Sequence, residues 1–319
     1  MDILEKERKL KKLEDELDRL EDEQEKREII ASIEAYKVKT MSKLTAWDRV
    51  LLARHSERPN VKTYIDALFE DFFELHGDRQ YADDASVIGG IALFGNRPLT
   101  VIGHRKGCTT AENIACNFGM AHPEGYRKAR RLMKQAEKFD RPIVTFIDTP
   151  GAYPGIGAEA RGQATSIADN LFEMSDLGVP IITFIVGEGG SGGALAVGMG
   201  NTVVMLENSI YSILSPEGYA SILWKDASKM KEAAEVMKLT SYDLAEHGII
   251  DGIVKEPLGG AHHDPEMVFD GVRETLSSAL TRFAEMTPYE IKTARYAKYR
   301  QIGFFQRFNY DHLKPGGQS

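Results

Sequence analysis

The stretch VPIITFIVGEGGSGGALA, residues 179–196, joins an apolar run to a glycine-rich turn and indicates the fold class. Its first half has an earlier copy, because PIVTFI at 142–147 matches PIITFI at 180–185 at an offset of 38 residues. Each copy leads into a turn rich in glycine or proline and then into a segment of helical character. Two such strand, turn and helix units predict parallel strands joined by helical crossovers. Because both runs are apolar throughout, we expect the two faces of these strands to be covered.

Composition divides the chain into three regions. Residues 41–295 contain the repeated units and, around Gly95-Asn96, two β-rich runs that a hairpin turn would join. We expect this region to be the main α/β domain and residues 296–319 to be a C-terminal helix and tail. Residues 1–40 are dense in charged side chains and predict a helix that packs on a neighbouring helix or subunit, because leucines recur at spacings of three and four: Leu10, Leu13, Leu17 and Leu20.

The overall composition is that of a globular protein of 319 residues, with 42% hydrophobic and 28% charged residues. No apolar run reaches the roughly 18 residues of a membrane span, and the N-terminus is charged, so we expect a cytoplasmic protein. The net charge of −8 argues against generic nucleic-acid binding. We expect no metal on this chain, since Cys108 and Cys116 are too far apart for a zinc knuckle and His262 and His263 lack a third ligand at suitable spacing.

The turn at 187–193 satisfies two motifs at once. Gly187, Gly189 and Gly192 spell G-x-G-x-x-G, and Gly189, Ser191 and Gly193 spell G-x-S-x-G. A dinucleotide site fits the first motif poorly, because the residues before the next predicted strand leave room for barely two helical turns, whereas a Rossmann crossover needs a longer helix.

Three interpretations of the turn remain open. In a serine hydrolase, Ser191 would be the nucleophile, with Asp251 and His262 or His263 following in the order of that fold, although an H-G-G-G-like oxyanion loop is missing. In a purely structural role, the glycines would allow close packing of helix and strand. In the third interpretation, Gly192 and its two successors present backbone N–H groups at the start of a helix, where the helix dipole also favours a developing oxyanion.

Four longer motifs identify a family resemblance. These are IDTPGAYPGIGAEARGQ at 147–163, IVGEGGSGGALAVGMGN at 185–201, ILSPEGYASILWKD at 213–226 and EPLGGAHHDP at 256–265. Together they make residues 45–300 similar to the α subunits of bacterial acetyl-CoA carboxylase carboxyltransferases. The resemblance implies an α/β fold of the crotonase (ClpP-like) type, a superhelix of ββα repeats, with an N-terminal helical extension.

The same resemblance implies a reaction and its partners. The carboxyl group would pass from carboxybiotin, held by biotin carboxyl carrier protein, to acetyl-CoA, which gives malonyl-CoA for fatty acid synthesis. The chain would act with a β subunit in an α2β2 heterotetramer, with biotin carboxylase in the wider complex and without membrane or specific nucleic acid. A serine hydrolase using Ser191 is the alternative function, and a non-catalytic scaffold that assembles through the N-terminal helix is a third.

The site residues that we expect fall into three groups. The amides of Gly192, Gly193 and Ala194 would form an oxyanion hole for the ureido oxygen of biotin. The biotin cleft would be lined by Gly151, Ala152, Tyr153, Gly189, Gly190 and Tyr219. Cations on a predicted helix form a candidate patch for the phosphates of CoA: Arg127, Arg130 and Arg131.

Overall fold

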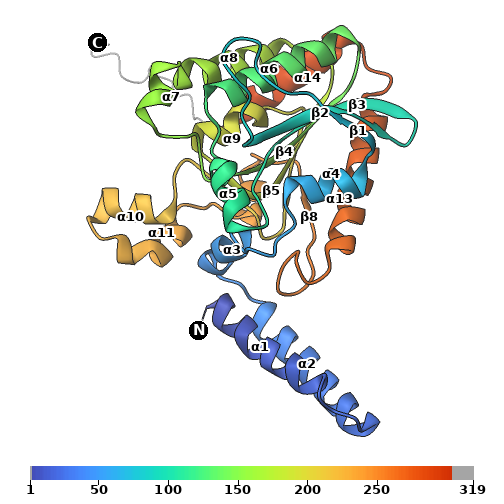
Figure 1. Cartoon of the computed structure of the whole chain (residues 1–319), viewed down its shortest axis with the longest axis vertical. Helices are drawn as coiled ribbons and strands as arrows, with labels where there is room; N and C mark the ends of the chain where they lie inside the picture. Colours follow the sequence, from blue (N-terminus) through green and yellow to red (C-terminus); the bar gives the residue numbers. More distant parts are fainter. Residues whose placement is uncertain (1, 304–319) are drawn as a thin grey trace, which may run out of the picture.

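A computed structural model describes residues 2–303 of the chain and shows one mixed sheet with helices on both faces (Figure 1). The strand order is β1-β2-β3-β4-β5-β6-β8, and β7 pairs with the end of β5. β1, β2 and β3 are antiparallel, whereas β3 to β6 and β8 run parallel. The strand bounds are β1 Glu70–Glu74, β2 Val87–Phe94, β3 Arg97–His104, β4 Ile143–Thr149, β5 Ile181–Gly190, β6 Thr202–Leu206, β7 Ile210–Ser212 and β8 Gly252–Val254.

The two copies of the repeated sequence form neighbouring parallel strands, as predicted. Ile143 pairs with Ile181 and Phe146 with Phe184, so equivalent residues of β4 and β5 lie side by side in register. Thr145 Oγ1 donates a hydrogen bond of 2.8 Å to the matching hydroxyl of β5. All seven residues of β4 and all ten of β5 are buried, which confirms that both faces of these strands are covered.

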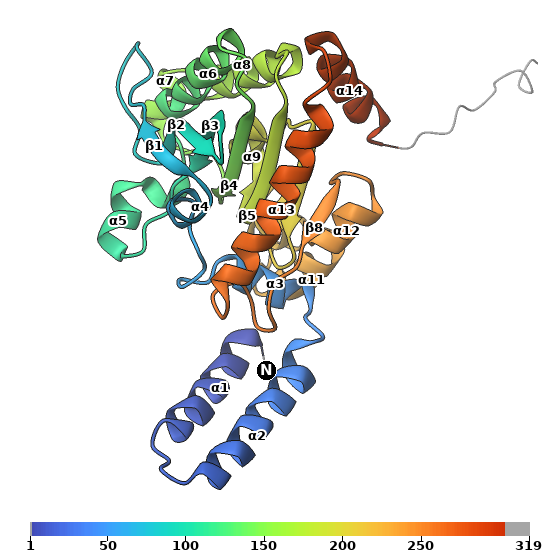
Figure 2. The same ribbon diagram turned by 90° about the vertical axis from the view of Figure 1, so that its right-hand side faces the viewer.

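Helices cover the two faces unequally. On one face α6 (Pro123–Lys138), α8 (Gln163–Asp176) and α9 (Ser191–Gly198) pack over one apolar cluster. On the other face α4 (Val61–Leu68) and α13 (Pro265–Phe283) cover a second cluster (Figure 2). The remaining helical segments are α3 Ala46–Ala53, α5 Thr110–Ala115, η1 Asn117–Gly119, α7 Ile156–Ala160, α10 Pro216–Trp224, η2 Ala227–Lys229, α11 Met230–Val236, α12 Ser241–Glu246 and α14 Pro288–Gln301.

The charged N-terminal segment is a helical hairpin that projects from the domain (Figures 1 and 2). It consists of α1 (Ile3–Leu17) and α2 (Glu23–Met41). Leu10, Leu13 and Leu17 of the predicted seam pack in one cluster with side chains of α2, so the neighbouring helix belongs to the same chain. Leu20 lies in the turn between the helices, because α1 ends before it.

The last helix of the described residues is α14. Helix α14 begins at Pro288 because Thr287 forms a capping box there, eight positions before the expected boundary at residue 296. Residues 304–319 of the predicted tail lie outside the described residues. Within residues 2–303, no helix is both long and apolar enough to cross a bilayer.

Candidate active site

The glycine-rich turn carries the chain from β5 directly into α9. Ser191, the first residue of the helix, has a φ of +50°, a conformation that is unfavourable for residues with a side chain. The first N–H groups of a helix have no carbonyl partner within it. The described cap and turn hydrogen bonds do not include the N–H groups of Gly192 or Gly193. The turn therefore holds two adjacent donors at the positive end of a helix dipole.

The loop after β4 lies directly against this turn. An added Cβ at Gly190 would come within 2.1 Å of the carbonyl oxygen of Pro150, and one at Gly193 within 2.7 Å of Ala152 N. At Gly192 the nearest atom would be a methyl group of Ile167 at 3.4 Å. The absence of side chains at Gly190 and Gly193 thus lets the main chains of the two loops come into contact. At Gly192, by contrast, the space that a side chain would occupy is open.

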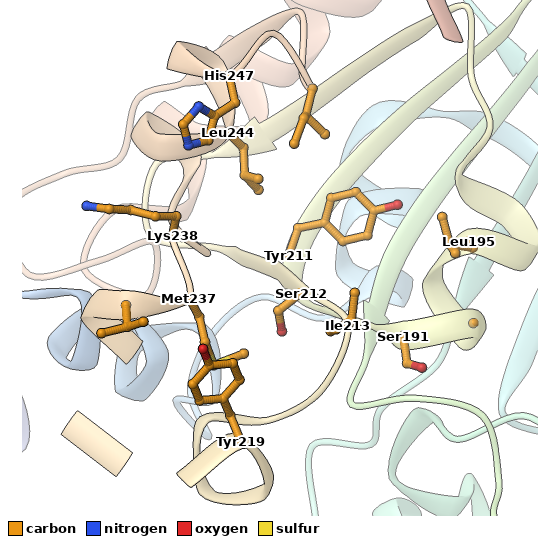
Figure 3. Close-up of a pocket in the computed structure, with 13 residues that line it drawn as sticks. Ser191, Leu195, Tyr211, Ser212, Ile213, Tyr219, Met237, Lys238, Leu244 and His247 are labelled. Carbon is orange, nitrogen blue, oxygen red and sulfur yellow. The ribbon is translucent and has the colours of Figure 1, made fainter. Parts of the chain in front are cut away.

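An apolar pocket of about 630 Å³ opens beside the start of α9. Figure 3 shows side chains from α9, from β7 and from the α10–α12 segment around it. Ser191, Gly192 and Tyr219 are among the predicted residues that line it. Its apolar lining includes Leu195, Ile213, Val236, Met237, Leu244 and Ile249, and its polar lining includes Tyr211, Lys238 and His247.

The other residues predicted for the cleft lie around this pocket without lining it. Gly189 and Gly190 pair with β7 and so belong to the end of the β5 strand. Gly151 and Ala152 form the loop that contacts the turn. Tyr153 stacks on His122, with ring centroids 4.1 Å apart. Ala194 is the fourth residue of α9 and is fully buried.

Two buried polar side chains beside Gly193 were not among the predicted site residues. Tyr126 Oη would lie 3.0 Å from a Cβ at Gly193, and it has no hydrogen-bond partner among the described residues. His104, at the end of β3, lies against the main chain of Gly193, and burial lowers its pKa to about 3. His104 is therefore neutral and adds no charge beside the two N–H donors. Neither residue could be assigned to the site from local sequence, because their positions beside Gly193 depend on contacts between distant segments.

A network of charged side chains joins the ends of the three central strands. Lys106 Nζ lies 2.7 Å from Asp148 Oδ1 and 3.1 Å from Glu188 Oε1. Glu188 also pairs with Arg54, which in turn contacts Glu217. Burial opposes ionisation of Glu188, but Lys106 and Arg54 outweigh it and keep its pKa below the usual range. Because Asp148 and Glu188 directly precede the two contacting loops, this network fixes the loops relative to each other.

The structure does not assemble the serine hydrolase triad. Asp251 accepts a hydrogen bond from Val203 N at 2.6 Å and contacts Lys298. His262 lies 3.2 Å from Glu7, and His263 packs on the ring of His262. None of the three candidate partners lines the pocket that contains Ser191. Ser191 does lie in a strained conformation between strand and helix, but the candidate acid and bases are engaged elsewhere.

The predicted basic residues of α6 do share one surface pocket, of about 940 Å³, near the start of α8. Arg127 pairs with Asp78 at 2.7 Å, and Arg130 pairs with Asp169 at 2.8 Å. Arg131 instead donates to main-chain carbonyls, including that of Gly77 at 3.0 Å, and no ion pair is recorded for it within residues 2–303. Arg131 is therefore the least compensated of the three cations.

Comparison with known proteins gives consistent results. The family model described as "Acetyl co-enzyme A carboxylase carboxyltransferase-like" matches residues 2–303. The acetyl-coenzyme A carboxylase carboxyl transferase subunit alpha of Bacillus subtilis strain 168 is 57% identical over 260 residues, which cover 82% of this chain and 80% of that protein. Its namesake in Staphylococcus carnosus strain TM300 is 50% identical over 313 residues, 95% of this chain and 99% of that protein.

Solved structures share the fold at low identity. A transcarboxylase 12S structure with methylmalonyl-coenzyme A bound has a TM-score of 0.59 at 19% identity, covering 71% of this chain and 42% of that one. The β subunit of geranyl-CoA carboxylase from P. aeruginosa has a TM-score of 0.55 at 15% identity, covering 82% and 47% of the two chains. These neighbours share the mixed α/β fold that was predicted, and the superhelix of ββα repeats stays a prediction. The chain belongs to the family of acetyl-CoA carboxylase carboxyltransferase α subunits.

Proposed function

We propose that this chain is the α subunit of a biotin-dependent carboxyltransferase that converts acetyl-CoA into malonyl-CoA for fatty acid synthesis. Membership of the family over residues 2–303 and the names of its relatives support this function. The observation that carries the proposal is the pair of N–H donors at Gly192 and Gly193 beside an apolar pocket. A serine hydrolase is disfavoured because none of the predicted partners of Ser191 (Asp251, His262 and His263) lines the pocket that contains this serine.

The pocket suits the bicyclic ring of biotin. Its walls are apolar at Leu195, Met237 and Leu244, and Ser191 and Gly192 at the start of α9 also line it. When bound, carboxybiotin supplies the carboxyl group and then a nitrogen base for the methyl proton of acetyl-CoA. The N–H groups of Gly192 and Gly193 would hold the ureido oxygen as it gains negative charge. Removal of one such donor typically costs about 3 kcal/mol of transition-state stabilisation.

The remaining predicted cleft residues would support this arrangement. Gly151 and Ala152 would hold the turn in place through their main-chain contact with it. Gly189 and Gly190 would align the turn with the sheet, and Tyr219 would close the far side of the pocket. Ala194 would contribute to oxyanion binding through the helix dipole, because its N–H group lies further along the helix than those of Gly192 and Gly193.

The exposed rim of the pocket supports the partner subunit in this proposal. Leu195, Ile213 and Val236 are 44%, 77% and 56% exposed, which provides an apolar surface next to the donors. We propose that a β subunit covers this rim and supplies a second oxyanion hole for the thioester of acetyl-CoA, in an α2β2 heterotetramer. Biotin carboxyl carrier protein would deliver the biotin that biotin carboxylase has charged. The free thiols Cys108 and Cys116 suit a cytoplasmic location.

Ser191→Ala is expected to retain at least about a third of the malonyl-CoA formation in the complex reconstituted with the β subunit and carrier. The serine contributes no nucleophile in this mechanism, and alanine meets about the same cost of 1–2 kcal/mol in the left-handed conformation. Ser191→Gly is the matched control, because glycine removes that strain. Initial rates with carboxylated carrier measure both variants. A loss of about 100-fold in both, together with ester hydrolysis by the isolated wild-type chain, would favour the hydrolase.

Arg131→Ala is expected to raise the KM for acetyl-CoA about fivefold and to leave kcat unchanged, which corresponds to ~1 kcal/mol of lost binding. The reason is that Arg131 pairs with no carboxylate within residues 2–303, which leaves its positive charge available for a phosphate of CoA. Arg130→Ala is the control, since Asp169 and Glu173 already neutralise that guanidinium, and Arg127 is similarly held by Asp78. Equal KM values for the wild type and Arg131→Ala would show that this patch does not bind acetyl-CoA.

A further inference from the structure

A cluster of one carboxylate and two imidazoles lies outside the site described above, where the N-terminal hairpin meets the α/β domain. Glu7 comes from α1, His55 follows α3, and His262 lies in the segment before α13. One ligand atom from each residue lies within 4.8 Å of the others. The side chains are 14%, 16% and 6% exposed, respectively, so the cluster is shielded from solvent.

Each imidazole contacts a different oxygen of Glu7, at a distance close to that between neighbouring ligands of a tetrahedral zinc ion. Glu7 Oε2 lies 3.4 Å from His55 Nε2, and Glu7 Oε1 lies 3.2 Å from His262 Nε2. Ligands at about 2.0–2.1 Å from a tetrahedral Zn²⁺ are separated from each other by about 3.3–3.4 Å. The two imidazole rings are stacked, with centroids 4.0 Å apart and an interplanar angle of 14°.

The cluster is not satisfied by its own hydrogen bonds. Glu7 Oε1 and His262 Nδ1 are buried and have no hydrogen-bond partner among the described residues. The contact between Glu7 Oε1 and His262 Nε2 is close, yet it is not aligned as a hydrogen bond. A buried polar atom without a partner costs about 1–3 kcal/mol. Nitrogen and oxygen atoms that converge in this way are arranged for a shared cation.

We propose that Glu7, His55 and His262 bind Zn²⁺, which fastens α1 to the α/β domain. Two imidazoles and one carboxylate are ligands that Zn²⁺ accepts, with a water molecule as the fourth. The proposal departs from the expectation of no metal on this chain, and it does not depend on the proposed function. No local motif predicts the site, because its ligands come from three distant segments of the chain.

Binding requires one proton to move. His55 Nδ1 accepts a hydrogen bond of 3.2 Å from Glu57 N, so the neutral ring carries its proton on Nε2. When Nε2 coordinates zinc, the ring carries its proton on Nδ1 instead. The exposed N–H of Glu57 then hydrogen-bonds to water in place of Nδ1. His262 needs no such change, because its Nδ1 is free to carry the proton.

The test is zinc binding by the full chain after EDTA treatment and desalting. A Cys108→Ser background removes an exposed thiol that could bind zinc itself. We expect one tightly held zinc per chain by elemental analysis, a higher melting temperature with zinc, and visible d–d absorption when Co²⁺ replaces it. Glu7→Gln and His262→Ala should each weaken zinc binding at least about tenfold.

The matched control is Glu14→Gln, which removes another α1 carboxylate, one that pairs with Lys37 at 3.3 Å. This variant should bind zinc like the background chain. The proposal is overturned if the background chain binds no zinc saturably, or if Glu7→Gln and His262→Ala bind it as tightly as Glu14→Gln does. It is also overturned if Glu7→Gln lowers the melting temperature while zinc leaves that of the background chain unchanged, because the carboxylate then acts only as an ion-pair partner. The Co²⁺ spectrum of the background chain remains a test if a variant fails to fold.

Discussion

Gly193→Ala is expected to lower kcat for malonyl-CoA formation by at least about 100-fold, the scale of a lost oxyanion donor. The new methyl group would lie 2.7 Å from Ala152 N and Gly151 C, which are main-chain atoms that cannot move independently of their loop. The turn and the loop must therefore separate, and the two N–H donors leave their positions. Single-turnover rates with carboxylated carrier and acetyl-CoA measure the effect.

Gly192→Ala is the matched control for this change. Its methyl group would meet only Ile167 at 3.4 Å, an ordinary contact, so the melting temperature should not fall. Because the side of Gly192 is open, we expect the variant to raise the KM for the carboxylated carrier with a smaller effect on kcat. Equal kcat values for Gly193→Ala and the wild type would show that the contact between the loops does not position the donors.

Glu256→Ala is expected to lower the free energy of unfolding by about 3–5 kcal/mol, because it leaves the charge of Arg58 buried without a partner. The two side chains are 3% and 0% exposed, and Arg58 donates to both oxygens of Glu256 at 3.0 and 2.5 Å. Glu256 also accepts hydrogen bonds from Asn208 N and Ala261 N. Urea denaturation of the wild type and variant measures the difference.

Asp66→Ala is the control, because its pair with Lys62 is exposed and should contribute less than about 1 kcal/mol. The buried pair also has a predictable pH dependence. Burial opposes ionisation of Glu256, yet Arg58 lowers its pKa below the usual range. The stabilisation is therefore complete above the unfolded-state pKa and is lost as the pH falls towards the lowered value. A loss below about 1 kcal/mol for Glu256→Ala would contradict the argument.

The sequence alone predicted the parts of the fold that depend on local pattern. The repeat at 142–147 and 180–185 predicted two parallel strands, and Ile143 and Ile181 indeed pair in register. The Gly95-Asn96 turn predicted the β2–β3 hairpin, in which Phe94 pairs with Arg97. In both cases a local sequence pattern was enough. The pairing of strands that follow one another along the chain depends mainly on residues that are close together in the sequence.

Features that depend on contacts between distant segments could not be predicted in this way. The compensation of Arg127 and Arg130 by carboxylates depends on how α6 packs against other segments, so the three cations looked equivalent. Asp251 and His262 follow Ser191 in hydrolase order, but chain order does not place side chains, and both are held elsewhere. The roles of the glycines at 190 and 193 became clear only when the opposite loop was seen.

The main-chain contact between Pro150 O and the turn at Gly190 holds the start of α9 in place but lines no part of the pocket. No side chain separates the two loops there, so their separation follows the spacing of adjacent strands, about 4.8 Å. Truncating a residue there would gain no space. An engineer who wants the enzyme to accept a bulkier biotin analogue should therefore trim Val236, Met237 or Leu244, which line the pocket and belong to the α11–α12 segment.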